Sequence, residues 1–144
     1  MKQVVIYFDM DGVLARHPGK TSGKEVDFHN LEPIEEMVTL YKELAKDPRY
    51  DVYLASTAPW SAPEAWTAKR VWADKYLGDA AFKRLILTHR KDMLMGDILI
   101  DDREANGAKD FKGQWIQYVE GGDISPAYIE CIARGEYLLK QEQK

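Results

Sequence analysis

Residues 4–12 read VVIYFDMDG, a five-residue apolar run that ends in two aspartates and a glycine. The run is short and rich in β-branched and aromatic side chains, which is typical of a strand buried on both faces. Two carboxylates at a strand end can point into one site, and the glycine lets the backbone approach a ligand closely. Asp-x-Asp alone is a weak signal, since an acidic turn has the same composition. Its place at the strand end makes Asp9, Asp11 and Gly12 the first candidate site residues.

Four more runs of this kind follow along the chain, and helical patterns lie between them. The expected strands are Val52–Ser56, Leu85–Thr88, Ile98–Asp101 and Trp115–Val119. This alternation predicts an α/β fold, a doubly wound (Rossmann-like) parallel sheet of about five strands with helices on both faces. No repeat or linker interrupts it, so residues 1–144 are expected to form a single domain.

The helix boundaries can also be predicted from local signals. Apolar residues recur at helical spacing after Pro33, which a first helical turn tolerates. Residues 61–64, SAPE, have the pattern of a capping box, and Gly78 is expected to end the helix that follows. A last helix is expected to begin at Ser125 and Pro126.

Composition restricts the function classes. The chain is 45% hydrophobic and 31% charged, the balance of a globular protein, and its net charge of −4 leaves no basic stripe for nucleic-acid binding. No apolar run approaches the ~20 residues that span a bilayer, and the amino terminus is too short for a secretory signal, so no membrane partner is expected. The single cysteine, Cys131, fits a reducing cytoplasm, and the three histidines lack zinc-ligand spacing.

A second acidic strand end follows at residues 97–103, DILIDDR. Parallel strands carry their ligands at their carboxyl ends, so Asp101 and Asp102 are expected to lie near the first site. Carboxylates that converge at one edge repel each other unless a cation lies between them, and all-oxygen ligation suits Mg²⁺. The alternative is that Asp102 and Arg103 form a surface turn, which leaves the acidic strand ends unexplained.

Two further strand ends carry groups that can bind phosphate. Ser56 and Thr57 follow the second strand, and their hydroxyls can donate to a phosphate oxygen, although both are also common turn residues. Arg90 and Lys91 follow the third strand, and either could supply a positive charge at the same edge. Spacing alone does not choose between these two cations.

Residues 9–14, DMDGVL, give the chain its resemblance to the haloacid dehalogenase-like hydrolases, which use an aspartate nucleophile at the end of the first strand. Residues 52–59, 72–78, 97–103 and 106–108 make it similar to the 5′(3′)-deoxyribonucleotidases of that superfamily. The resemblance covers roughly residues 4–14 and 32–119. It implies a Mg²⁺-dependent phosphatase of nucleoside monophosphates, a phosphoric monoester hydrolase, that works through an aspartyl-phosphate.

The resemblance also assigns roles to the candidate residues. It implies Asp9 as nucleophile and Asp11 as general acid and base, and it selects Lys91 over Arg90. Mg²⁺ would be held by Asp9, the main-chain carbonyl of Asp11 and Asp102, with Asp101 acting indirectly or through water. The phosphoryl oxygens would be bound by Ser56, Lys91 and the Gly12 amide, with help from Thr57.

The chain departs from the resemblance in one segment. Only residues 12–31 stand where these enzymes carry a helical cap, and Pro18, Gly19 and Gly23 argue against helices there. We expect a short cap, weak discrimination among bases, and a second copy of the chain as the group that could close the site.

Aromatic residues offer further contacts with a base. Trp60, just after the second strand, could stack on a base or merely cover the start of a helix, and Phe28, His29 and Asn30 are the other candidates. Trp66, Trp72 and Trp115 are expected to pack in the core.

Alternative functions are a phosphatase or phosphotransferase for another small phosphate or a polynucleotide end, or a non-catalytic binding protein. The intact set of acids, Ser56 and Lys91 argues against the last of these.

Overall fold

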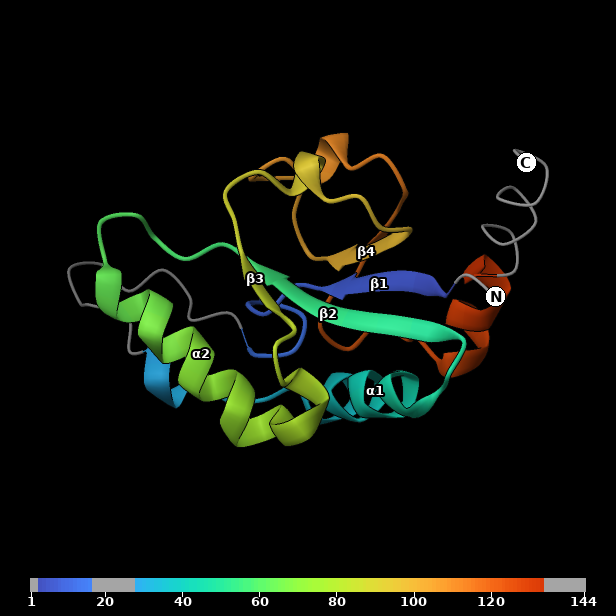
Figure 1. The fold of residues 1–144 in the computed structure, drawn as a ribbon, viewed down its shortest axis with the longest axis horizontal. Coiled ribbons are helices and arrows are strands. Elements are labelled where there is room, and N and C mark those ends of the chain that lie inside the picture. Colours follow the sequence, from blue (N-terminus) through green and yellow to red (C-terminus); the bar gives the residue numbers. More distant parts are fainter. Residues whose placement is uncertain (1–2, 17–27, 134–144) are drawn as a thin grey trace.

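The computed structural model describes residues 3–16 and 28–133, and a parallel five-stranded sheet organises them (Figure 1). Its strands are β1 (Val4–Phe8), β2 (Tyr50–Ser56), β3 (Leu85–Leu87), β4 (Ile98–Asp101) and β5 (Gln114–Gln117). Their order is β3-β2-β1-β4-β5, and every neighbouring pair is parallel. The expected α/β fold is confirmed, and each strand lies within two residues of its expected bounds.

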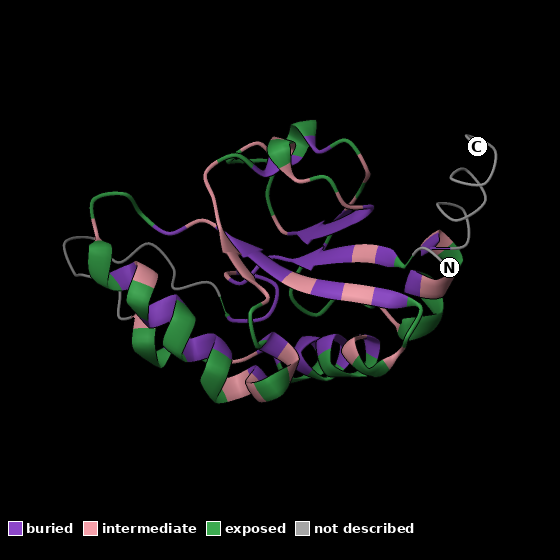
Figure 2. Ribbon diagram, viewed as in Figure 1, coloured by how far each residue is buried: buried purple, intermediate pink, exposed green. Residues whose placement is uncertain are grey.

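The two faces of the sheet are covered differently. Helices α1 (Glu35–Lys46) and α2 (Pro63–Leu77) pack on one face, below the sheet in Figure 1, against residues such as Ile6 and Phe8. The other face, which includes Tyr7, is covered by the short 3-10 helices η3 (Lys91–Met93) and η4 (Ala108–Asp110). Figure 2 shows the strands buried between these layers and the outer sides of α1 and α2 exposed.

The helix boundaries confirm two expectations and correct one. Gly78 follows Leu77 with a φ of +57° and ends α2, and the last described helical residues, 126–133, begin after Ser125, whose Oγ accepts the Tyr128 N–H at 3.1 Å. The predicted capping box is wrong, because Ala62 is the N-cap of α2 and makes no side-chain cap hydrogen bond. Pro63 explains this, since proline fits the first helical position and disfavours helical geometry in the residue before it. Helix α1 likewise begins at Glu35, two residues after Pro33.

The central position of β1 fixes where its carboxyl end lies. The Asp9 N–H donates to the Ile100 carbonyl at 2.9 Å, so the first aspartate lies beside the end of β4. After it the chain turns tightly, with the N–H groups of residues 13–15 directed at the Met10 carbonyl. The Arg16 N–H then donates to the Glu32 carbonyl at 2.7 Å, which brings together the two ends of the expected cap segment. Residues 17–27 of that segment lie outside the described residues.

Two further 3-10 helices lie next to α2. Helix η1 (Phe28–Asn30) packs against α2, and η2 (Gly78–Ala81) directly follows α2 in the chain. None of the helices among residues 3–16 and 28–133 has the length and apolar character needed to cross a membrane.

Candidate active site

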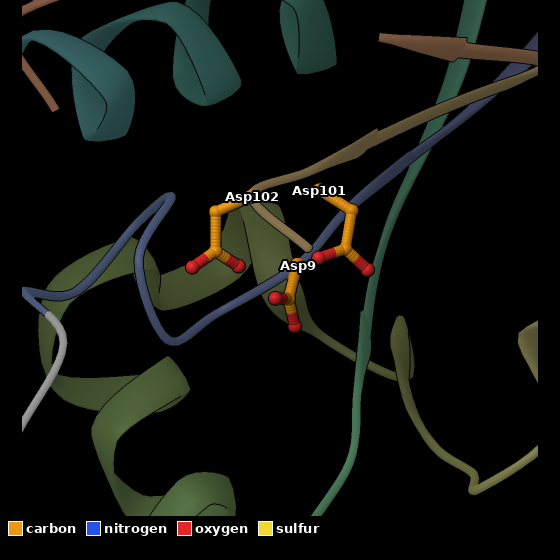
Figure 3. Close-up of side chains that lie close together, drawn as sticks. All are labelled: Asp9, Asp101 and Asp102. Carbon is orange, nitrogen blue, oxygen red and sulfur yellow. The ribbon is translucent and has the colours of Figure 1, made fainter. Parts of the chain in front are cut away.

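Three aspartates converge where β1 and β4 end. Carboxylate oxygens of Asp9, Asp101 and Asp102 all lie within 4.8 Å of one another, and Figure 3 shows the three side chains close together at the strand ends. Asp9 and Asp101 are buried and Asp102 is partly buried. The parallel pairing of β1 with β4 produces this arrangement, because Phe8 is paired with Ile100 and the next residue of each strand is an aspartate.

Lys91 supplies a positive charge to this cluster. Its Nζ lies 2.6 Å from Asp101 Oδ2 and 3.1 Å from Asp9 Oδ1, and the side chain is buried. Arg90 points elsewhere, since its guanidinium is exposed and binds Asp92 at 2.7 Å. The structure therefore places Lys91, and not Arg90, among the strand-end carboxylates.

The protonation equilibria reflect the crowding of these acids. Burial raises the pKa of Asp9 well above its usual range, the Lys91 ammonium lowers it in part, and the neighbouring Asp101 raises it again. Burial and Asp101 also raise the pKa of Asp102. Burial lowers the pKa of Lys91, but the charges of Asp9 and Asp101 outweigh it and hold that pKa above its ordinary value. The cluster is thus short of positive charge with Lys91 alone.

The donor set fits a divalent cation. Asp102 Oδ1 is buried and has no hydrogen-bond partner among residues 3–16 and 28–133, which is costly for a carboxylate unless a cation or water reaches it. Both oxygens of Asp101 are engaged, Oδ2 by Lys91 and Oδ1 by the Arg103 N–H at 3.1 Å. Asp101 has both oxygens engaged and Asp102 does not, which favours Asp102 over Asp101 as the direct ligand of a cation. Several carboxylate oxygens within a small space are the ligands that Mg²⁺ prefers.

Gly12 leaves space for the Asp102 carboxylate. A Cβ at position 12 would lie 2.2 Å from Asp102 Oδ2, and the φ of +86° is one that side chains with a Cβ rarely adopt. The Gly12 N–H donates to the Ala15 carbonyl at 2.7 Å. Binding of a phosphate oxygen by this amide stays a prediction and would require it to exchange that acceptor.

Asp11 is held by a lysine that the sequence did not reveal as a site residue. Lys69 of α2 is completely buried, and its Nζ lies 2.8 Å from Asp11 Oδ2 and 3.0 Å from Ser56 Oγ. The same Nζ lies 5.4 Å from the centre of the Phe28 ring. Asp11 Oδ1 is buried and has no hydrogen-bond partner within the described part of the chain. One oxygen of Asp11 is therefore fixed, and the other is available to a reacting group.

The loops after β2 and β3 are joined by a hydrogen bond. The Thr57 hydroxyl donates to the Thr88 carbonyl at 2.7 Å, and the Arg90 N–H donates to the Thr88 hydroxyl at 2.9 Å. Thr57 thus ties together the loops that precede α2 and η3. Its expected contact with a phosphate oxygen stays a prediction.

The aromatic candidates separate into core and surface groups. Trp72 is buried and its Nε1 donates to the Leu31 carbonyl at 2.9 Å, as expected for a core residue, and Trp115 is half-buried against the second face of the sheet. Trp66 is only half-buried, and its ring centre lies 6.1 Å from that of Trp60, which is 81% exposed. Phe28 lies beside Lys69, whereas His29 and Asn30 are exposed.

Comparison with known proteins fits this geometry. Residues 20–124 match the family described as 5′ nucleotidase, deoxy (Pyrimidine), cytosolic type C protein. A putative 5′(3′)-deoxyribonucleotidase of Vibrio phage KVP40 is 34% identical over 96% of this chain and 86% of its own length. The chain belongs to the 5′(3′)-deoxyribonucleotidase family. It is a phosphoric monoester hydrolase of the haloacid dehalogenase type, as the sequence resemblance predicted.

Cellular deoxyribonucleotidases share a smaller part of the chain. The human mitochondrial 5′(3′)-deoxyribonucleotidase is 32% identical over 53% of this chain, but only 33% of its own length is matched. A putative 5′(3′)-deoxyribonucleotidase of Bordetella pertussis is 35% identical over 51% of this chain and 39% of its own length. The chain therefore shares with these relatives a segment that is less than half of each of them.

Proposed function

We propose that this chain is a Mg²⁺-dependent phosphatase that hydrolyses nucleoside monophosphates, deoxyribonucleotides in particular, through an aspartyl-phosphate on Asp9. The observation that carries the proposal is the convergence of Asp9, Asp101 and Asp102 beside the buried Lys91. The deoxyribonucleotidases that the chain resembles support the substrate class.

Asp9 is the nucleophile of the proposed reaction. Its carboxylate would attack phosphorus in line, forming an oxygen–phosphorus bond as the bond to the nucleoside oxygen breaks. Water would then cleave the aspartyl-phosphate and restore the carboxylate. Burial of Asp9 beside Lys91 supports this role, because a fixed nucleophile next to a cation can approach an anionic phosphate.

Asp11 is the general acid and base. It would give a proton to the leaving nucleoside oxygen and later remove one from the attacking water. The unpartnered Asp11 Oδ1 is the atom we assign to this transfer, while Lys69 holds Oδ2. Lys69 is therefore a positioning residue in this proposal.

The phosphoryl group would be bound by Lys91 and the Ser56 hydroxyl, with the Gly12 amide and Thr57 as additional donors. Mg²⁺, held by Asp9, Asp102 and the main-chain carbonyl of Asp11, would screen the repulsion between the nucleophile and the phosphate, with Asp101 acting indirectly. Placement and charge stabilisation of this kind supply most of the catalysis of phosphoryl transfer.

We assign residues 12–31 to a short cap within a single domain of residues 1–144, and we expect a second copy of the chain to be able to close the site. A cytoplasmic location is supported by the single cysteine and by similarity to the cytosolic-type human deoxyribonucleotidase.

Phosphate release from ribo- and deoxyribonucleoside 5′- and 3′-monophosphates, from a phosphorylated oligonucleotide and from an unrelated small phosphate ester, each with Mg²⁺ or with EDTA, tests this function. We expect Mg²⁺-dependent release that EDTA abolishes and that favours the deoxyribonucleotides. Release only from a phosphorylated polynucleotide end or from an unrelated small phosphate would contradict the substrate class. Undiminished release in EDTA would contradict the metal.

A further inference from the structure

Three aromatic side chains form a cluster beyond the carboxyl ends of β2 and β3, and we call Trp60, Trp66 and His89 the aromatic cluster. The ring centres of Trp60 lie 6.1 Å from Trp66 and 6.2 Å from His89, with interplanar angles of 78° and 71°. Trp66 and His89 are 5.8 Å apart at 38°. The cluster is built from two loops and a helix, because Trp60 follows β2, His89 follows β3, and Trp66 lies in the first turns of α2.

Within the aromatic cluster Trp66 is fixed by a hydrogen bond, whereas Trp60 is exposed to solvent. The Trp66 Nε1–H donates to the Pro59 carbonyl at 2.9 Å, which fixes its indole against the loop that carries Trp60. Trp60 itself remains 81% exposed. Burial of apolar area therefore explains little of its position, since most of the indole still contacts water.

Trp66 of the cluster lies about one helical turn from Lys69, which contacts the proposed phosphate ligand Ser56. Trp66 and Lys69 are three residues apart in α2, so their side chains are neighbours on one face of the helix. Lys69 contacts both Asp11 and Ser56. The hydrogen bond from Thr57 to the Thr88 carbonyl draws the Trp60 loop and the His89 loop together on the same side. Figure 1 shows the segment between β2 and α2, and the start of α2, at the end of the molecule where β1 and β2 finish.

We infer that the aromatic cluster is the base subsite of this enzyme, with Trp60 stacking on the nucleobase of a nucleoside monophosphate whose phosphate lies at Asp9. The inference rests on the proposed function and adds the part of the substrate that the acidic cluster does not contact. Aromatic rings stack on any base, so this subsite confers affinity for nucleotides without selecting one base.

The experiment compares two substrates that differ only in the base. kcat/KM is measured for dTMP and for 2-deoxyribose 5-phosphate with wild type, Trp60→Ala and Phe82→Ala, a matched control because Phe82 is 67% exposed just before β3, away from the site. We expect Trp60→Ala to lower the dTMP to deoxyribose 5-phosphate ratio about tenfold, mainly through KM for dTMP, and Phe82→Ala to leave it unchanged. A ratio within twofold of wild type in Trp60→Ala would overturn the inference.

A binding measurement keeps this result separate from failure of the proposed function. Tryptophan fluorescence is titrated with dTMP, deoxyribose 5-phosphate and inorganic phosphate in the presence of Mg²⁺. Quenching by dTMP alone, lost in Trp60→Ala, supports the base subsite even where neither ester is hydrolysed. Equal quenching by all three compounds, or none by dTMP, would show that the aromatic cluster does not contact a base.

Discussion

Lys69 Nζ lies 2.8 Å from Asp11 Oδ2, joining residues 58 positions apart in the sequence through a completely buried ammonium group. The same ammonium donates to Ser56 Oγ, so one side chain fixes both the proposed acid–base residue and a proposed phosphate ligand. A buried charge is costly unless it is paired, and Lys69 is paired on the side that faces the site. Because pairing rarely does more than offset the desolvation of a buried ammonium, the contact is better explained by the placing of Asp11 and Ser56 than by a gain in stability.

Lys69→Met tests this contact. The methionine retains most of the volume but leaves Asp11 without its partner, so we expect kcat to fall about 10–100-fold while Mg²⁺ affinity changes little. In an Asp11→Asn background the same substitution should lower kcat little further, because Lys69 acts by positioning the Asp11 carboxylate, which that variant lacks. Lys75→Met, an exposed position of the same helix, is the control. Equal losses in both backgrounds would assign Lys69 a purely structural role.

Asp9→Asn is expected to abolish turnover and to leave the fold intact. Burial raises the pKa of Asp9 in the folded protein, so the folded state favours the protonated acid. Without metal, the free energy of unfolding therefore falls as the pH rises from the usual aspartate range toward the raised pKa. The neutral amide removes this effect, so at pH 7 the metal-free variant should melt at or above the wild-type temperature. Calorimetry in EDTA measures this, and binding of BeF₃⁻ with Mg²⁺ should occur in wild type only. Near-normal kcat in Asp9→Asn would exclude Asp9 as nucleophile.

Asp11 and Asp102 should respond differently to magnesium. Asp11→Asn should slow catalysis ~10²–10⁴-fold with Mg²⁺ affinity largely retained, because the proposed ligand at this position is the backbone carbonyl. Asp102→Ala should weaken Mg²⁺ binding, and a higher Mg²⁺ concentration should restore part of the rate. Titration calorimetry and rates at several Mg²⁺ concentrations distinguish the two. The opposite pattern would mean that the two roles are exchanged.

Gly12→Ala and Gly121→Ala form a matched pair. Both glycines have a φ of +86°, but only at Gly12 would the new Cβ meet a neighbour, the Asp102 carboxylate. Gly121→Ala should cost about 1–2 kcal/mol for the backbone conformation alone. Gly12→Ala should cost more and should also weaken Mg²⁺ binding by displacing Asp102. Thermal melting with and without Mg²⁺ measures both effects, and equal behaviour of the pair would contradict a close Gly12–Asp102 contact.

The sequence predicted the parts of the fold that depend on local pattern. The apolar runs that form β1 and β4 are uniform because both faces of these strands are buried, and their acidic ends meet because the two strands are parallel neighbours. The start of α2 differs from the expected one because Pro63 sets the first helical position, so the serine–glutamate pattern at 61–64 does not form a capping box.

Lys69 could not have been predicted from its local sequence. A lysine in a helix is ordinarily solvated, and its sequence neighbours indicate its burial only weakly. Its role depends on the tertiary packing that brings α2 against the turn carrying Asp11. The one available signal was its place on the same face as the buried Trp72 and the half-buried Trp66.

The central place of β1 in the sheet has a consequence for how activity is lost. Asp9, Ser56, Lys91 and Asp102 come from successive segments of the chain, and they meet only because β2 and β4 flank β1 on opposite sides. No fragment that omits β2 or β4 contains a complete site. Denaturant should therefore abolish hydrolysis and dismantle the sheet in one concerted step, so residual enzymatic rate becomes a direct reporter of the intact native population.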